Sequence, residues 1–324
     1  MRFSVSSETQ PLYDAYLKAY TDAVGDCLQF LSDAMKAMEK PYKAESPGDL
    51  AAFLLIRHII ESIDGVCILV SRGSIHPCEP LLRSALEASL SVSYILSDDT
   101  NRRGVAFLTA ETRKELKLLR QRDPEDALGK QVLAQNTAGQ ITDLIGEIPI
   151  DLLRKKIDAL KADLNDLPLK PINAEFERIK AARKSAKPSP PCAICGRGDP
   201  VDKPGDPEWY SLFGGPKNVQ QLAQQLKVNY LYEFMYRPWS SATHAANNMR
   251  NVDASDDSVI LRPIRHPDGM NMVLRSCVVL TVPLALLLFR KYSPEAENDV
   301  DKRNDELAAK INQVLKTENV PWKK

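Results

Sequence analysis

The sequence predicts an all-α protein, and two observations lead to this fold class. Apolar residues recur with the helical period of about 3.6 residues along most of the 324-residue chain. No segment alternates apolar and polar side chains with period two over more than a few residues, as a half-buried strand would. We therefore expect a helical bundle with four core helices, further helices at its periphery and one long loop rich in Pro and Gly.

Start and stop signals bound the first three predicted helices. The first covers about residues 11–40. Ser46, an N-cap residue type, directly precedes Pro47 and opens the second helix, which ends before Gly73. The third runs over about residues 76–98 and carries one apolar stripe, as a helix inside a bundle does. This stripe consists of Leu82, Ala85, Leu86, Ser89, Leu90 and Ile95.

Composition divides the remaining chain. Residues 101–183 are rich in charge and interrupted by prolines, which predicts peripheral helices, whereas residues 184–215 have the Pro/Gly-rich composition of an exposed loop. We expect one compact domain overall, made of N-terminal helices (1–183), this loop (184–215) and a C-terminal helical part (216–324).

The C-terminal part contains the remaining predicted helices, over about residues 217–227, 228–249, 269–292 and 299–317. Helices 228–249 and 269–292 complete the four-helix core with the second and third helices. The VILRPI stretch within residues 253–267 is compatible with a short strand.

Charge and hydropathy limit where in the cell we expect the protein and which partners it can bind. Lys plus Arg and Asp plus Glu both number 43, so any nucleic-acid binding requires a local basic patch. The N-terminus has no signal-peptide-like apolar run, and we expect a cytoplasmic protein whose six cysteines are reduced and mostly fill the core. The most apolar stretch, Cys277 to Phe289, is shorter than the roughly 20 residues that cross a bilayer. It predicts a buried core helix and no membrane contact.

The most informative segment is NYLYEFMYRPWSSATHAANNM, residues 229–249. On a helix, a step of seven residues turns through about 700°, so Arg237 and His244 share a face. The rest of that face is small or hydrogen-bonding, unlike the Lys/Glu mixture of a solvated helix. We therefore predict a site formed by Arg237 and His244, with Glu233, Tyr236, Ser240, Ser241, Asn247 and Asn248 as binding or orienting residues. The opposite, buried face holds Val228, Leu231, Tyr232, Met235, Trp239, Ala242, Ala246 and Met249.

Pro238 affects the geometry of this helix. It lacks an N–H and disfavours helical angles at Arg237, so we expect a kink or a restart of the helix there. A restart would place Arg237 at a helix N-terminus, where free N–H groups favour a bound anion. Either geometry suits a phosphate near Arg237.

Two further pairs are candidates for supporting roles. Arg83 and Glu87 lie one turn apart on the otherwise apolar third helix, which predicts a partly buried ion pair with a structural role or, near helix 228–249, a site-orienting role. Cys192 and Cys195 form a CxxC pair in the 184–215 loop, but tetrahedral zinc requires four ligands. The pair is compatible with a structural zinc completed elsewhere, with a redox pair or with no role.

The segment from Tyr236 to His244 resembles the R-x(4–6)-H motif of the HEPN superfamily. It is also similar to the YRxLSxxxH helix of a large uncharacterised bacterial family with the same bundle, and LLRSALEASLSVSYIL is similar to that family's R-x-x-x-E helix. The resemblance covers roughly residues 46–98 and 209–292, and it implies a HEPN-like helical bundle. HEPN enzymes commonly carry a polar residue directly after the Arg, where this chain has Pro238.

The resemblance implies a metal-independent endoribonuclease that acts as a homodimer in toxin–antitoxin or antiviral defence systems, with RNA as substrate and a cognate antitoxin or regulatory protein as a further partner. It assigns catalysis to Arg237 and His244. No cofactor is then required for catalysis.

Two other functions are compatible with the residues. The Arg/His face of a non-catalytic module would bind a nucleotide, a phosphorylated ligand or a partner protein, in agreement with Pro238 and the neutral net charge. Alternatively, the chain is a structural or regulatory partner that uses the CxxC loop for interaction.

Overall fold

The computed structural model describes residues 7, 9–39, 46–135, 149–185, 206–243, 252–255, 258–261 and 263–316, of which residues 241–243, 253–255 and 258–260 are described by their backbone alone. These parts of the chain are almost entirely helical, so the predicted all-α class is confirmed. Contacts within the chain define two compact units: unit 1 comprises Met1–Asp98 and Val219–Lys324, and unit 2 comprises Asp99–Asn218. The boundaries that the sequence predicts at 183/184 and 215/216 stay a prediction, as does the single compact domain.

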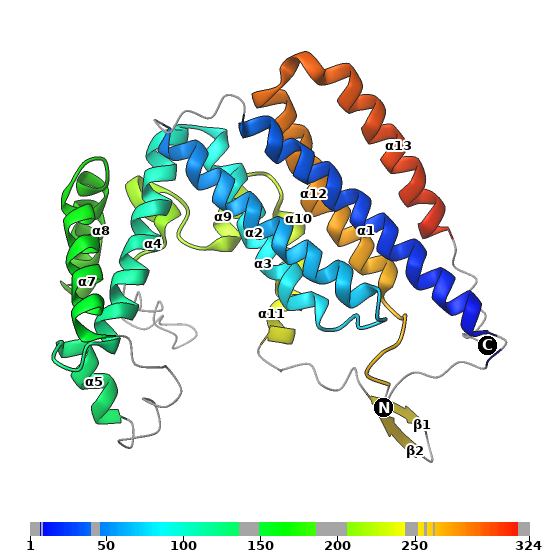
Figure 1. Cartoon of the computed structure of the whole chain (residues 1–324), viewed down its shortest axis with the longest axis horizontal. Coiled ribbons are helices and arrows are strands. Elements are labelled where there is room, and N and C mark those ends of the chain that lie inside the picture. Colours follow the sequence, from blue (N-terminus) through cyan, green and yellow to red (C-terminus); the bar gives the residue numbers. More distant parts are fainter. Residues whose placement is uncertain are drawn as a thin grey trace, which may run out of the picture. The chain divides into compact units, whose positions relative to one another are not determined.

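Four long helices form the core of unit 1 (Figure 1). Helix α2 packs against α1 and α3, and α12 packs against α1, α3 and α13. The bounds of these helices are α1 Gln10–Glu39, α2 Pro47–Val70, α3 Cys78–Ser97, α12 Met270–Tyr292 and α13 Glu297–Leu315. The cap predicted for α2 is present, because the Ser46 side chain accepts the Asp49 N–H at 3.4 Å.

The sequence places helix 228–249 among the four core helices, whereas the structure gives that central position to α1. Buried side chains follow one another along α1 at alternating steps of about four and three residues, which line up on one face of a helix. They are Tyr20, Val24, Cys27, Leu31 and Ala34, each at most 1% exposed. Helix α9 (Val219–Gln225) and the helical segment 229–243 instead pack against α3.

Helix α12 is long and apolar enough to span a membrane by length and composition alone. In unit 1, however, it packs against α1, α3 and α13, and Leu274, Cys277 and Leu288 are fully buried. It is therefore the core helix that the sequence predicts. A hairpin precedes α12 in the chain. Its strand β1 (Val252–Ser255) pairs antiparallel with β2 (Ser258–Leu261), which confirms the short strand predicted in this region.

Four of the six cysteines lie in the described residues, and all four are free thiols of unit 1. Burial raises the pKa of Cys27 and of Cys78 to about 12, and that of Cys277 well above its ordinary value. A thiol with so high a pKa stays protonated and unreactive at neutral pH. These cysteines act as small core residues, as predicted, while Cys192 and Cys195 lie outside the described residues.

Unit 2 contains the helices predicted in the charged region. Helix α4 packs against α5, α7, α8 and the 3-10 turn η1, and a small core of Leu119, Leu153 and Ile157 lies within the unit. The bounds are α4 Thr100–Arg122, α5 Ala127–Gln135, α7 Ile150–Asn165, α8 Leu169–Ser185 and η1 Trp209–Gly214.

A network of ion pairs around Arg113 connects several parts of unit 2. Arg113, whose side chain is 10% exposed, donates to both carboxylate oxygens of Asp206 at 2.9 Å and to Glu177 at 2.7 Å, and also contacts Asn173. Its guanidinium lies 5.0 Å from the centre of the Phe176 ring. Because these partners come from α8 and from the segment before η1, one side chain links three parts of the unit.

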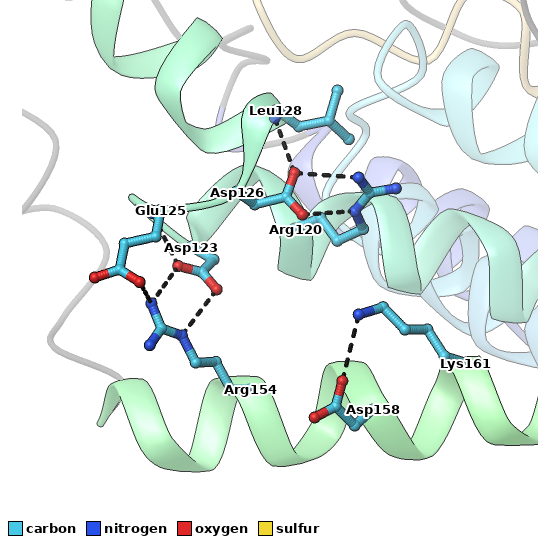
Figure 2. Close-up of polar contacts among 8 residues, drawn as sticks. All are labelled: Arg120, Asp123, Glu125, Asp126, Leu128, Arg154, Asp158 and Lys161. Atoms are coloured by element: carbon cyan, nitrogen blue, oxygen red, sulfur yellow. Dashed lines mark hydrogen bonds and ion pairs between the residues drawn. The ribbon is translucent and has the colours of Figure 1, made fainter.

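The turn between α4 and α5 is closed by a second group of ion pairs (Figure 2). Arg154 of α7 donates to both oxygens of Asp123 at 3.1 Å and to Glu125 at 2.7 Å. Within the same turn, Arg120 donates to Asp126, which also accepts the Leu128 N–H. These bidentate bonds fix the direction in which α5 leaves α4.

Candidate functional site

The segment Asn229–Thr243 is a continuous helix with one widened turn. It consists of α10 (Asn229–Leu231), the π turn η2 (Tyr232–Tyr236) and α11 (Arg237–Thr243). The Arg237 N–H donates to the Tyr232 carbonyl, five residues back, and Arg237 has helical angles (φ −61°, ψ −49°). The expected restart is therefore wrong, and Arg237 does not lie at a free helix N-terminus. The expected kink stays a prediction.

Pro238 explains the widened turn. Its nitrogen cannot donate to the Phe234 carbonyl, and its ring would clash with that carbonyl in a regular α-helix. A turn with hydrogen bonds from residue i to residue i−5 makes room for the ring, and such π turns occur frequently at functional sites. The helix thus accommodates Pro238 without being interrupted.

The side chains of this helix form four rows, each made of residues four positions apart. The first row is the buried one: Leu231 and Met235 are 8% exposed and Trp239 is 5% exposed. These three residues belong to the buried face predicted from the sequence, and α11 packs against α3. The remaining rows are therefore directed to the rim of α3 or to solvent.

Arg237 lies on a solvent-facing row together with Glu233. Its Nη1 atom is 2.8 Å from Glu233 Oε2, and the side chains are 65% and 33% exposed respectively. The hydrogen bond and the charge of Glu233 raise the pKa of Arg237 further above its ordinary range. The guanidinium is thus charged, held in direction by its neighbour and open to solvent.

The next row connects this helix to α3 through Tyr236. Arg83 Nη2 donates to the Tyr236 hydroxyl at 3.0 Å, and the guanidinium carbon lies 4.7 Å from the centre of the same ring. Arg83 Nε also donates to Glu87 at 3.1 Å, with side chains 18% and 45% exposed. The sequence leaves open whether this ion pair is structural or orients the site. Its contact with the residue next to Arg237 favours the orienting role.

The surroundings of Tyr236 and Arg83 keep both side chains protonated at neutral pH. Burial raises the pKa of Tyr236, the Glu87 carboxylate raises it further, and Arg83 opposes both effects. Burial also lowers the pKa of Arg83, but the Tyr236 hydroxyl and Glu87 outweigh that effect and leave it raised. At neutral pH the contact is therefore between a protonated phenol and a charged guanidinium. The Tyr232 ring stacks on Tyr236 at a centroid distance of 5.1 Å and supports it from the preceding turn.

The structure brings together Arg83, Glu87, Glu233, Tyr236 and Arg237 of the predicted site, and Ser240 is half-buried one turn further along. His244, Asn247 and Asn248 lie outside the described residues, as do Cys192 and Cys195, and only the backbone of Ser241 is described. In the parts of the chain that are described, no group of three or more His, Cys, Asp or Glu side chains is arranged to hold a metal ion.

Two features of this region are not predicted from the sequence. Tyr232 is assigned to the buried face by the helical projection, but it is half-buried and supports Tyr236. Tyr230 and Phe234 form an exposed row beside Arg237, with 55% and 76% of their surface accessible. The spacing of four between two aromatic residues is visible in the sequence, but the side they face depends on the π turn.

The site belongs to a mainly helical unit in which a charged and aromatic helix packs on α3. Residues 49–259 match the model of a family of unknown function (DUF5677). Because this match covers more than half of the chain, the protein belongs to that family. No curated protein and no solved structure matches the chain.

Proposed function

We propose that the protein is a metal-independent endoribonuclease of HEPN type, which cleaves RNA at a site formed by Arg237 and His244. The supporting observation is the state of Arg237: its guanidinium is charged, exposed and directed by Glu233, on a helix whose sequence continues to His244. A guanidinium that is charged, accessible and held in a fixed direction stabilises negative charge that develops on a phosphate.

The chemistry follows from the two residue types. An imidazole has an unperturbed pKa near 6.5, so His244 serves as general base toward a ribose 2′-OH at neutral pH. The 2′-OH passes its proton to His244 and its oxygen attacks the adjacent phosphorus. The bond to the 5′ oxygen of the next nucleotide breaks, this oxygen takes up a proton from water, and a 2′,3′-cyclic phosphate remains. Arg237 stabilises the phosphorane during this displacement.

We expect each active site to be formed by two copies of the chain. A step of seven residues corresponds to about 10 Å along a helix, which is too far for one copy to direct both side chains at one phosphorus. An antiparallel crossing of two such helices on a two-fold axis near Ser240 and Ser241 brings each Arg237 toward the His244 of the other copy. Small serines at the crossing allow the backbones to approach.

The experiment compares RNA cleavage by purified variants in the presence of EDTA. Arg237→Ala and His244→Ala should each abolish cleavage. Arg57→Ala is a matched control, since Arg57 is 66% exposed and pairs at 3.0 Å with Glu61 in the same i, i+4 arrangement on α2. Exposed ion pairs contribute at most about 1 kcal/mol, so Arg237→Ala and Arg57→Ala should fold. The melting temperature of His244→Ala, compared with that of the parent, shows whether this variant is folded.

Cleavage that persists in His244→Ala, or that is lost equally in Arg57→Ala, contradicts the proposal. If the protein acts as a toxin, its expression should also arrest growth, and the double variant Arg237→Ala/His244→Ala should not.

One observation favours a second function, a non-catalytic module that binds a nucleotide or another phosphorylated ligand. Pro238 stands directly after Arg237, where HEPN enzymes commonly carry a polar residue, and it is exposed. Such a module needs only the charged Arg237. It predicts that the phosphorylated ligand raises the melting temperature of the protein, that Arg237→Ala removes this shift, and that no RNA is cleaved.

A further inference from the structure

An aromatic row is exposed on the helix that carries Arg237. Phe234, with 76% of its surface accessible, is the most exposed aromatic residue of the described chain, and Tyr230, one turn earlier, is 55% exposed. Pro238 continues the same row and is also exposed. Burying a phenylalanine ring is favourable by a few kcal/mol, so a ring left this open contributes little to folding.

The other rows of the helix show that this exposure is not a consequence of poor packing. Leu231, Met235 and Trp239, each one residue further along, are almost completely buried against the body of unit 1. The rings of Tyr232 and Tyr236 stack on each other, and the Tyr236 ring also contacts Arg83. Other aromatic residues of the helix therefore make its contacts with the rest of unit 1, and Tyr230 and Phe234 are exposed in addition to them.

The neighbouring charge indicates which partner suits this row. Arg237 follows Phe234 by three residues, so the two side chains are neighbours on the helix surface, and its side chain is 65% exposed. Flat aromatic rings beside a cation match single-stranded nucleic acid, whose unpaired bases stack on the rings while its phosphates contact the cation. A duplex does not offer this combination because its base faces are covered.

We infer that Tyr230 and Phe234 stack unpaired bases of the RNA whose phosphate is bound at Arg237, and so restrict the protein to single-stranded RNA. This inference rests on the proposed function for the phosphate position. It adds the two rings as residues that determine substrate specificity, and they position the strand without taking part in the displacement at phosphorus.

The test measures binding of a fluorescein-labelled single-stranded 2′-O-methyl RNA of mixed sequence, and of the same strand annealed to its complement, by fluorescence anisotropy in EDTA. The 2′-O-methyl groups remove the attacking hydroxyls, so the strand stays intact during the measurement. Phe234→Leu keeps an apolar side chain but removes the ring, and it should weaken single-strand binding roughly tenfold, as expected for one lost base stack. Phe234→Tyr keeps the ring and should bind as the parent does. Because Phe234 is mostly exposed, both variants should retain the parent's melting temperature.

Three results would overturn the inference. The first is unchanged single-strand binding in Phe234→Leu. The second is a parent protein that binds duplex as tightly as single strands or binds neither. The third is a change of Phe234→Leu from dimer to monomer in size-exclusion chromatography, which would assign the row to contact with a second copy.

Cleavage assays on the same variants separate this inference from the proposed function. If Arg237→Ala abolishes cleavage while Phe234→Leu binds and cleaves single strands normally, the proposed function stands and the base-stacking role fails. If Phe234→Leu loses single-strand binding but no variant or parent cleaves RNA, the base-stacking role stands and the nuclease proposal fails.

Discussion

At the scale of single residues, Tyr236 is the connection between the candidate site and the bundle. Its hydroxyl and its ring both contact Arg83, and its backbone directly precedes Arg237. A displacement of this ring would therefore move the start of α11. Arg83 and Tyr236 are positioning residues for Arg237, since the solvent-exposed charge of the site belongs to Arg237 itself.

This role predicts the effect of Tyr236→Phe. The substitution removes the hydroxyl bond to Arg83 but keeps the ring, and the net contribution of such a bond is about 1 kcal/mol. We expect that loss in the free energy of unfolding, measured with urea, together with a decrease in RNA cleavage. Tyr230→Phe is the control, since Tyr230 is 55% exposed and its hydroxyl should not affect stability. Equal stability of the Tyr236→Phe variant and the parent would show that the bond does not hold α11.

At the scale of elements, the first turn of α5 tolerates only glycine at position 129, because the turn that precedes this helix lies against it. A Cβ placed there would lie 1.8 Å from the carbonyl oxygen of Asp123, so the turn that Asp123 and Arg154 close would have to open. Gly25 offers the opposite situation within α1, because a Cβ there meets nothing within 4 Å.

The two glycines predict substitutions of opposite sign. Gly129→Ala should destabilise unit 2 by more than about 2 kcal/mol, since backbone atoms must move. Gly25→Ala should stabilise unit 1 by about 0.5–1 kcal/mol, because alanine favours helix in an open position. Hydrogen exchange followed by mass spectrometry assigns each change to its unit. A stabilised Gly129→Ala variant would mean that the turn is not closed as described.

The sequence predicts the elements better than their assembly. Helix positions, the Ser46 cap and the buried face of Leu231, Met235 and Trp239 depend on local pattern, and each is found where the sequence places it. The π turn depends on how Pro238 packs within the folded helix, and the bond from Arg83 to Tyr236 joins residues 153 positions apart. Neither leaves a periodic signal. The central position of α1 is likewise not visible in the sequence. Several helices of the chain are amphipathic, and only their packing in the folded bundle determines which of them lies at the centre.

At the scale of the whole molecule, the two units differ in most of the groups whose pKa values are shifted by folding. In unit 1, burial raises the pKa of the Cys27 and Cys78 thiols to about 12 and also raises that of Tyr16 and Tyr292. In unit 2, the hydrogen bonds of Arg154 and Arg120 lower the pKa of Asp123 and Asp126, and that of Glu175 is lowered by its hydrogen bond with Arg178. Asp33 is an exception in the described part of unit 1. Burial raises its pKa, but hydrogen bonds, with Arg303 the largest contributor, outweigh burial and lower it.

The units should therefore lose stability at opposite ends of the pH scale. An unfolded thiol releases its proton near the ordinary value of 9.0, whereas folded Cys27 keeps it to about 12, so unit 1 loses about 1.4 kcal/mol per pH unit for each such group above that value. The carboxyls of unit 2 have the reverse sign: their stabilisation is complete above the ordinary value of 3.8 for Asp and is lost as pH falls through the lower folded pKa.

Hydrogen exchange at about pH 3, 7 and 10, analysed separately for each unit, measures both effects, with unit 2 opening first in acid and unit 1 first in alkali. In Cys27→Ala the alkaline loss per pH unit should be smaller although the protein is less stable at neutral pH. The same order of opening at both extremes would show that these groups do not set the pH dependence of the two units.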